Sequence, residues 1–205
     1  MHDILQSMMF IHIPKNGGTT MEAVLKNQQT IISRPHAAIP RNFLSPHSGW
    51  VSPWHMPPDM YEEIMKQRYN SKGFENRFCI VRNPIDRYIS DMHWSNWSFR
   101  TPFAKLAEMY AQNWSAVRWT EEAVHRMPQH MFVFSRSGHV QCDCIIAIER
   151  LKNITSVKKN THNIAHSPFE LPEGFFALYS ADHMIWSAAL KNHSLCHQEK
   201  SMAIW

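Results

Sequence analysis

The stretch FIHIPKNGGTTME, residues 10–22, decides the fold. An apolar segment ends at Pro14, and a helical pattern follows the two glycines, so a buried strand, a tight turn and a helix are expected in this order. Gly17 and Gly18 let backbone amides approach an anion closely at a helix N-terminus. In the P-loop of nucleoside-triphosphate enzymes, G-x-x-x-x-G-K-[ST], the lysine follows the last glycine. Here Lys15 precedes the glycines, which predicts a phosphate-binding turn with a different use of its lysine. The alternative is a capping box, Thr19-x-x-Glu22, which needs no ligand.

A second apolar strand, RFCIVR at residues 77–82, ends at Arg82. Asn83 suits the N-cap and Pro84 the first position of a helix that is expected to run to about Trp94. If the two strands are parallel, Arg82 lies at the same sheet edge as the first turn, where ligands of open α/β sheets bind.

The helix after Arg82 carries Ser90, eight residues further on. Arg82 and Ser90 together are expected to hold a second phosphate. Arg87 and Asp91 stand four residues apart and are expected to form an ion pair on the helix surface.

The rest of the chain alternates apolar strands with helical segments and shows no repeat or linker. This predicts a single domain over residues 1–205 with an α/β, P-loop-like three-layer fold, in which helices flank a central, mostly parallel sheet. Residues 33–58 hold six prolines and are expected to form a long loop. Further helices are expected at 58–68, 103–111, 115–126 and 181–192, and further strands at 130–134 and 140–149.

The composition is that of an ordinary globular protein, with 44% hydrophobic and 19% charged residues. The formal net charge of +4 is scattered, which argues against a nucleic-acid-binding protein. The chain shows neither a signal peptide nor an apolar run of the roughly 20 residues that a membrane helix needs, so a soluble protein without a membrane segment is expected.

The two motifs together resemble those of sulfotransferases, in particular the carbohydrate group that includes the chondroitin, dermatan and heparan enzymes. HIPKNGGTT, residues 12–20, is similar to that family's 5′-phosphosulfate loop, H-x-P-K-[TS]-G-[GS]-[TS]-[TS], with Asn16 in place of threonine or serine. IVRNPIDRYIS, residues 80–90, is similar to its 3′-phosphate motif, V-R-x-P-x-x-R-x-x-S. Residues 128–134, 148–151 and 161–168 follow in the order of the family's C-terminal half, so the resemblance covers nearly the whole chain.

This resemblance implies a sulfotransferase whose donor is 3′-phosphoadenosine 5′-phosphosulfate (PAPS), whose product is adenosine 3′,5′-bisphosphate (PAP), and which needs no metal. The expected acceptor is a hydroxyl group, most often of a carbohydrate. Lys15, ahead of the glycines, is expected to stabilise the charge that grows on the leaving 5′-phosphate oxygen. Residues 158–163, KKNTHN, resemble a loop that closes over the donor, although a solvated basic turn is an equal alternative. The expected donor contacts are Pro14, Lys15, Asn16, Gly17, Gly18, Thr19, Thr20, Arg82, Ser90, Lys158, Lys159 and Thr161.

The acceptor hydroxyl needs a base, which family members often place between the two motifs as a histidine or sometimes a glutamate. His55, directly before the helix at Pro58, is the first candidate and His47 the second, because neutral histidine is the usual base near pH 7. Glu62 and Glu63 are further candidates. The chain has 14 histidines, so chance placement is the competing explanation.

Three alternatives stay open. A nucleotide kinase-like enzyme has against it the order of lysine and glycines and the lack of a magnesium-binding aspartate after a strand. A catalytically inactive module that binds PAPS or another nucleotide would keep both motifs. A zinc site of His139, Cys142 and Cys144 with His162 and His166 is the third, although strand alternation explains the cysteines as small buried residues on one face.

The compartment is not decided by the sequence. Four cysteines without a C-x-x-C pair mildly favour a reducing compartment, whereas four N-x-[ST] sequons, at Asn96, Asn113, Asn153 and Asn192, point the other way. The resemblance implies the Golgi lumen, where family members carry an anchor and stem; this chain shows neither, so a cytoplasmic location stays open as the alternative.

Overall fold

The computed structural model describes residues 8–27, 51–66, 76–96, 98–153, 170–192 and 195–196. Within this part of the chain, four strands form one sheet in the order β1 (Met8–Ile11), β2 (Asn76–Val81), β3 (Cys144–Ala147) and β4 (Leu195–Cys196). The first three strands are parallel, and β4 is antiparallel to β3. The predicted α/β fold with a mostly parallel sheet is therefore confirmed.

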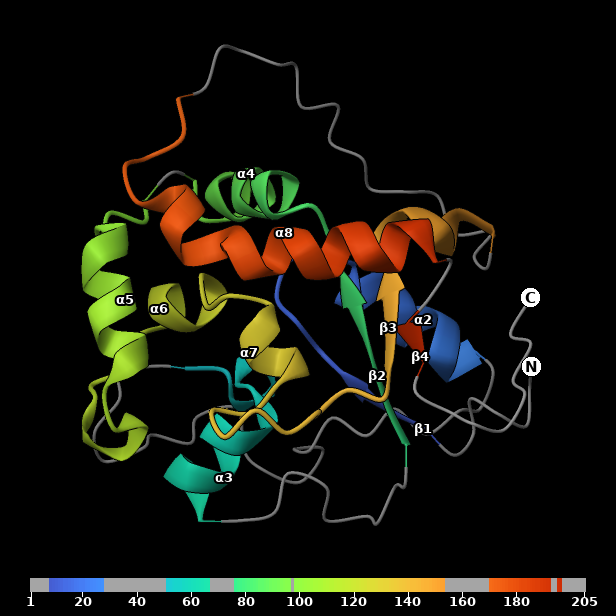
Figure 1. The fold of residues 1–205 in the computed structure, drawn as a ribbon, viewed down its shortest axis with the longest axis horizontal. Helices are drawn as coiled ribbons and strands as arrows, with labels where there is room; N and C mark the ends of the chain where they lie inside the picture. The colour runs from blue at the N-terminus through green and yellow to red at the C-terminus, as the bar shows by residue number, and fades with distance from the viewer. Residues whose placement is uncertain are drawn as a thin grey trace.

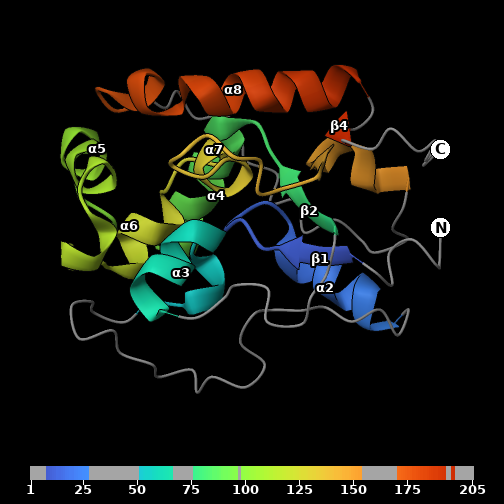
Figure 2. The same ribbon diagram turned by 60° about the horizontal axis from the view of Figure 1, so that its bottom comes forward.

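Side chains alternate between two cores along the parallel strands. In β2, Cys79 and Val81 belong to a large core, whereas Phe78 and Ile80 belong to a small core on the opposite face. Helix α2 (Gly18–Asn27) closes the small core, and helix α8 (Phe175–Lys191) packs on the large core. Figure 2 shows these two helices on opposite sides of the sheet, as the predicted three layers require.

The remaining helices gather beside the sheet, and α3 lies farthest from α8 (Figure 1). Helices α4, α5 and α7 all contact α8, which ties the large core together. Their bounds are α3 (Pro58–Met65), α4 (Pro84–Trp94), α5 (Phe103–Ala111), α6 (Glu121–His125) and α7 (His130–Val133), with short 3₁₀ turns η1 (Pro53–His55), η2 (Trp114–Ala116) and η3 (Ile148–Asn153).

The local signals around α4 and α5 act as predicted. Asn83 Oδ1 accepts the Ile85 amide at 2.9 Å and Pro84 takes the first helical position, so α4 begins where its cap stands. Helix α5 has the predicted bounds. Helix α3 ends three residues before the predicted end at residue 68, and α8 begins six residues before the predicted start at 181.

The predicted helix over residues 115–126 is wrong. Trp114 and Trp119 are both fully buried, and their indole nitrogens donate to the carbonyl oxygens of Tyr110 (3.1 Å) and Trp114 (2.9 Å). Burying both rings interrupts the helix between η2 and α6. Thr120 then caps α6 by accepting the Ala123 amide.

The predicted strand over residues 130–134 is also wrong, because residues 130–133 form helix α7. A carboxylate from distant sequence explains it: Asp182 of α8 accepts the amides of Gln129 (2.7 Å) and His130 (2.8 Å) at the start of this helix. Within this segment, only Phe134 makes a bridge, to Val140. The strand predicted over 140–149 shortens to β3.

The cysteines depart from the expectation of a shared face. Cys142 lies before β3 and packs in the large core, whereas Cys144 packs in the small core. Cys79 and Cys142 are free and buried, but Cys144 is disulfide-bonded. A thiol engaged in a disulfide cannot bind zinc as a thiolate, so the zinc site built on Cys144 and His139 is wrong.

None of the helices that the structure describes is both long and apolar enough to cross a membrane.

Candidate active site

The turn after β1 holds Lys15 and Gly17 in the left-handed backbone region, with φ of 66° and 80°. Glycine adopts this conformation freely, but lysine rarely does, so the neighbours of Lys15 must hold it. The Arg82 Nη1 donates to the Lys15 carbonyl oxygen at 3.3 Å, and the Arg87 Nε donates to the Pro14 carbonyl oxygen at 3.0 Å. The second motif thus fixes the shape of the first.

Two buried amides join the same motifs. Asn16 Nδ2 donates to the Ile80 carbonyl oxygen (2.8 Å) and to Gln129 Oε1 (2.6 Å). Gln129 in turn accepts the Arg82 amide and donates to the Arg82 carbonyl oxygen, both at 2.9 Å. Arg82 and the lysine turn therefore lie side by side at the ends of two neighbouring parallel strands. Sequence reasoning missed Gln129; the only signal was a polar amide after Pro128 in an otherwise apolar stretch.

Arg87 and Asp91 do not form the predicted surface pair, because both side chains are buried. Arg87 Nη2 donates to the His125 carbonyl oxygen at 2.6 Å, in addition to its bond to Pro14, so it connects the first turn to α6. Asp91 Oδ1 is 2.9 Å from His125 Nδ1. The i, i+4 spacing suggested a surface contact, whereas both residues face the protein interior.

Helix α2 begins at Gly18, so Thr19 lies in its first turn and not at the cap. Thr19 is exposed and Thr20 half-buried. The predicted capping box is therefore wrong, because Thr19 is not the N-cap, and Glu22 Oε1 is 2.8 Å from His12 Nδ1. The first turn of this helix therefore has the backbone amides and hydroxyls that an anion site at a helix N-terminus uses.

Gly18→Ala is expected to lower the free energy of unfolding by about 1–3 kcal/mol through overpacking. The added Cβ would lie 2.4 Å from His12 Cε1 and 2.5 Å from its Nε2, and the His12 ring is held by Glu22. Urea unfolding followed by circular dichroism measures the change. In the double variant with His12→Ala the clash is absent, so its loss should be smaller than the sum of the two single losses. If the two losses in free energy of unfolding were additive, the His12 ring would not be the cause of the destabilisation by Gly18→Ala.

The other predicted site residues are placed as follows. Ser90 is half-buried on α4 and makes no side-chain hydrogen bond to the residues that the structure describes. Glu63 accepts the Ser115 amide and is engaged away from the two motifs. Four predicted site residues lie outside the described ranges, namely His47, Lys158, Lys159 and Thr161.

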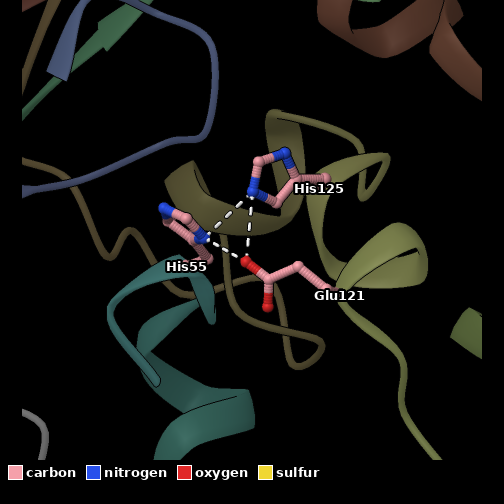
Figure 3. A group of neighbouring side chains, drawn as sticks. All are labelled: His55, Glu121 and His125. Carbon is pink, nitrogen blue, oxygen red and sulfur yellow. Dashed lines mark hydrogen bonds and ion pairs between the residues drawn. The ribbon is translucent and has the colours of Figure 1, made fainter. Parts of the chain in front are cut away.

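His55 belongs to a compact cluster with Glu121 and His125 (Figure 3). His55 Nδ1 is 2.9 Å from Glu121 Oε1 and 3.1 Å from His125 Nε2, and the latter is 3.2 Å from the same Glu121 oxygen. The other ring nitrogen of His55 points away from both partners. The His55 ring also lies 5.2 Å from the His12 ring at the end of β1, which brings it close to the lysine turn.

Trp94 connects this cluster to Lys15. Its indole stacks on the His125 ring with centroids 4.4 Å apart, and Lys15 Nζ lies 5.4 Å from its ring centroid, within the range of a cation–π contact. The indole is 55% exposed. It is therefore a large aromatic surface beside the candidate catalytic lysine.

Burial and hydrogen bonding shift the pKa values of Lys15, His55 and His125. Burial lowers the pKa of the Lys15 amine, which the Asp91 carboxylate only partly offsets. Burial lowers the pKa of His55 to about 4, and the hydrogen bond to Glu121 only partly opposes this. For His125, burial alone would lower the pKa, but the hydrogen bonds to Asp91 and Glu121 outweigh it and raise the pKa. The pKa values of the two imidazoles are thus shifted in opposite directions.

The cluster is also the group of described side chains that could hold a metal ion, since one ligand atom from each of His55, Glu121 and His125 lies within 4.8 Å of the others. All three come from outside the predicted zinc site. Glu121 and His125 were not predicted, because their contact with His55 joins segments that are far apart in sequence.

The comparisons with known proteins place the chain in one family. The family described as "Sulfotransferase family" matches residues 4–167. This match spans both predicted phosphate motifs, the histidine–glutamate cluster and Gln129. Neither the curated proteins nor the solved structures gave a match.

Proposed function

The chain belongs to the sulfotransferase family, and we propose that it moves a sulfuryl group from PAPS to a hydroxyl group of a carbohydrate, using one sulfotransferase domain over residues 1–205. The 5′-phosphate binds at residues 14–20 and the 3′-phosphate at Arg82 and Ser90. The observation that carries the proposal is the contact of Arg82 with the Lys15 carbonyl oxygen at 3.3 Å. Because of this contact, Lys15, Arg82 and the N-terminus of α2 lie at the same edge of the sheet. Two cationic side chains and a helix N-terminus in one place suit a ligand with two separate phosphates.

The reaction proceeds by in-line displacement at sulfur. The acceptor oxygen forms a bond to sulfur, the bond from sulfur to the 5′-phosphate oxygen breaks, and its electron pair stays on that oxygen. Lys15 neutralises this charge as it develops, with its amine directed from the Trp94 face to the leaving oxygen. As in phosphoryl transfer, positioning and charge stabilisation supply most of the rate.

The acceptor proton passes to His55 Nε2. This nitrogen points away from Glu121 and His125, so it is free to face the acceptor, and His55 lies next to His12 near the lysine turn. A sugar acceptor is favoured by the exposed Trp94 indole beside Lys15, because a flat aromatic surface suits the apolar face of a sugar ring.

His55→Ala is expected to lower kcat about 30-fold, with the dissociation constant for PAP changed less than about threefold. The loss is smaller than the roughly hundredfold that general-base catalysis commonly contributes, because a loose transition state needs little removal of the proton. Steady-state kinetics with a fixed acceptor and calorimetric titration with PAP measure both quantities. A wild-type kcat in the variant would show that another residue, such as His47, is the base.

Incubation with sulfur-labelled PAPS and a panel of glycans, phenols and lipids tests the function directly. Labelled glycan is the expected product. PAP should protect the chain against thermal unfolding and ATP with Mg²⁺ should not, since only PAP has a 3′-phosphate. Protection by ATP with Mg²⁺ would favour a kinase-like enzyme, and protection by PAP without turnover of any acceptor would favour an inactive binding module.

A further inference from the structure

The cluster of His55, Glu121 and His125 contains three short contacts between polar atoms, which cannot all be hydrogen bonds at the same time. The atoms His55 Nδ1, His125 Nε2 and Glu121 Oε1 form a triangle with sides of 2.9, 3.1 and 3.2 Å. If both nitrogens carry a proton, both can donate to the carboxylate, but two N–H groups then face each other at 3.1 Å. If only one nitrogen carries a proton, the lone pair of the other nitrogen faces a lone pair of the carboxylate oxygen. With Glu121 ionised, one of the three contacts is therefore repulsive for every arrangement of protons on the two nitrogens.

A single cation at the centre removes this conflict, because three lone pairs can then point at one positive charge. Zinc binds imidazole nitrogen and carboxylate oxygen at about 2.0–2.2 Å, which puts neighbouring ligand atoms about 2.9–3.5 Å apart for angles between 90° and tetrahedral. The three observed sides fall close to this range. Two imidazoles and one carboxylate are also a ligand set that divalent transition metals favour.

Each of two ligands is oriented by a further contact, as in metal sites generally. The second nitrogen of His125, Nδ1, is 2.9 Å from Asp91 Oδ1, and both side chains are 3% exposed. The second oxygen of Glu121 accepts the Ser52 amide at 2.7 Å. The carboxylates of Asp91 and Glu121 together balance the charge of a divalent cation bound by neutral imidazoles.

The cluster can also be reached from solvent. The His55 and Glu121 side chains are 14% and 26% exposed, whereas His125 lies beneath them. A cation can therefore enter and leave without unfolding of the core, and coordination positions remain open on the solvent side.

We propose that His55, Glu121 and His125 bind one divalent transition-metal cation of the Zn²⁺ class. The second part of the inference rests on the proposed function: a cation on His55 Nδ1 leaves the ring proton on Nε2, so His55 can no longer accept the acceptor proton. The site thus acts as an inhibitory cation site on the catalytic base.

Zinc binding is tested with the full, untagged chain after dialysis against a chelator, by competition with a chromophoric chelator. Wild type is expected to bind one equivalent tightly, and Glu121→Gln and His55→Ala to bind it at least about 100-fold more weakly. His183→Ala is the matched control, because His183 is an exposed histidine on α8. Circular dichroism checks that each variant is folded, and Mg²⁺, which prefers all-oxygen sites, should not compete.

The activity measurement separates the two parts. One equivalent of Zn²⁺ is expected to lower turnover by wild type and by His183→Ala at least tenfold, with recovery on addition of chelator. Equal zinc affinity in all four chains, or no tight equivalent in wild type, would overturn the site. Tight binding with unchanged turnover would overturn the inhibitory role. If no acceptor is sulfated at all, the proposed function fails while the binding measurement still decides the site.

Discussion

Lys15→Ala is expected to lower kcat for sulfuryl transfer about 1,000-fold, with the fold intact. Removing one group that stabilises charge in the transition state commonly costs about 100- to 1,000-fold, and Lys15 is the lysine of the turn that is proposed to hold the 5′-phosphate. The developing charge is absent from PAP, so the affinity for PAP should fall much less, by about tenfold or below. Single-turnover kinetics with labelled PAPS and calorimetric titration with PAP measure the two effects.

Lys66 provides the matched control. It is an exposed lysine that also has a left-handed backbone, with φ of 54°, at the end of α3. Lys66→Ala makes the same chemical change in the same backbone conformation and should leave kcat unchanged. If Lys15→Ala kept full activity, or lost PAP affinity and kcat to the same degree, the lysine would not act on the leaving oxygen.

Arg82→Ala is expected to weaken PAP binding about 300-fold and to leave the affinity for adenosine 5′-monophosphate within about threefold of wild type. Truncating one partner of a desolvated, hydrogen-bonded charge pair costs about 2–5 kcal/mol, and burial already lowers the pKa of Arg82, which marks a desolvated guanidinium. The monophosphate lacks the 3′-phosphate that Arg82 is proposed to bind. Competition titrations with the two nucleotides give the ratio directly.

Arg77 stands at the other end of the same strand and is half-buried. Arg77→Ala removes an equal charge from β2 and should change neither affinity by more than about twofold. A parallel loss for both nucleotides in Arg82→Ala would contradict the assignment, because it would mean that the variant disturbs the lysine turn through the lost 3.3 Å contact.

The sequence was sufficient wherever the decisive interactions are local. The turn at residues 14–18, the cap at Asn83 and the bounds of α5 follow from neighbouring residues, and all three are confirmed. The parallel arrangement followed from apolar strands alternating with helices, and it correctly brought Arg82 to the rim that carries Lys15.

The sequence was insufficient where a partner comes from a distant segment. Residues 130–133 have a strand-like composition but form a helix because Asp182 caps it. Arg87 and Asp91 have surface spacing but bind the Pro14 carbonyl oxygen and the His125 ring in the interior. Periodicity does not carry this information, since each contact joins residues more than 30 positions apart.

The Asp182 cap has a practical consequence for the choice of expression boundaries. The family match ends at residue 167, whereas Asp182 lies in α8, beyond it. Asp182 anchors Gln129, and Gln129 holds both Asn16 and Arg82. A fragment trimmed to the matched region would discard the residue that fixes this amide, and also strand β4, so any shortened version intended for soaking with nucleotides or for screening should retain the chain through residue 196.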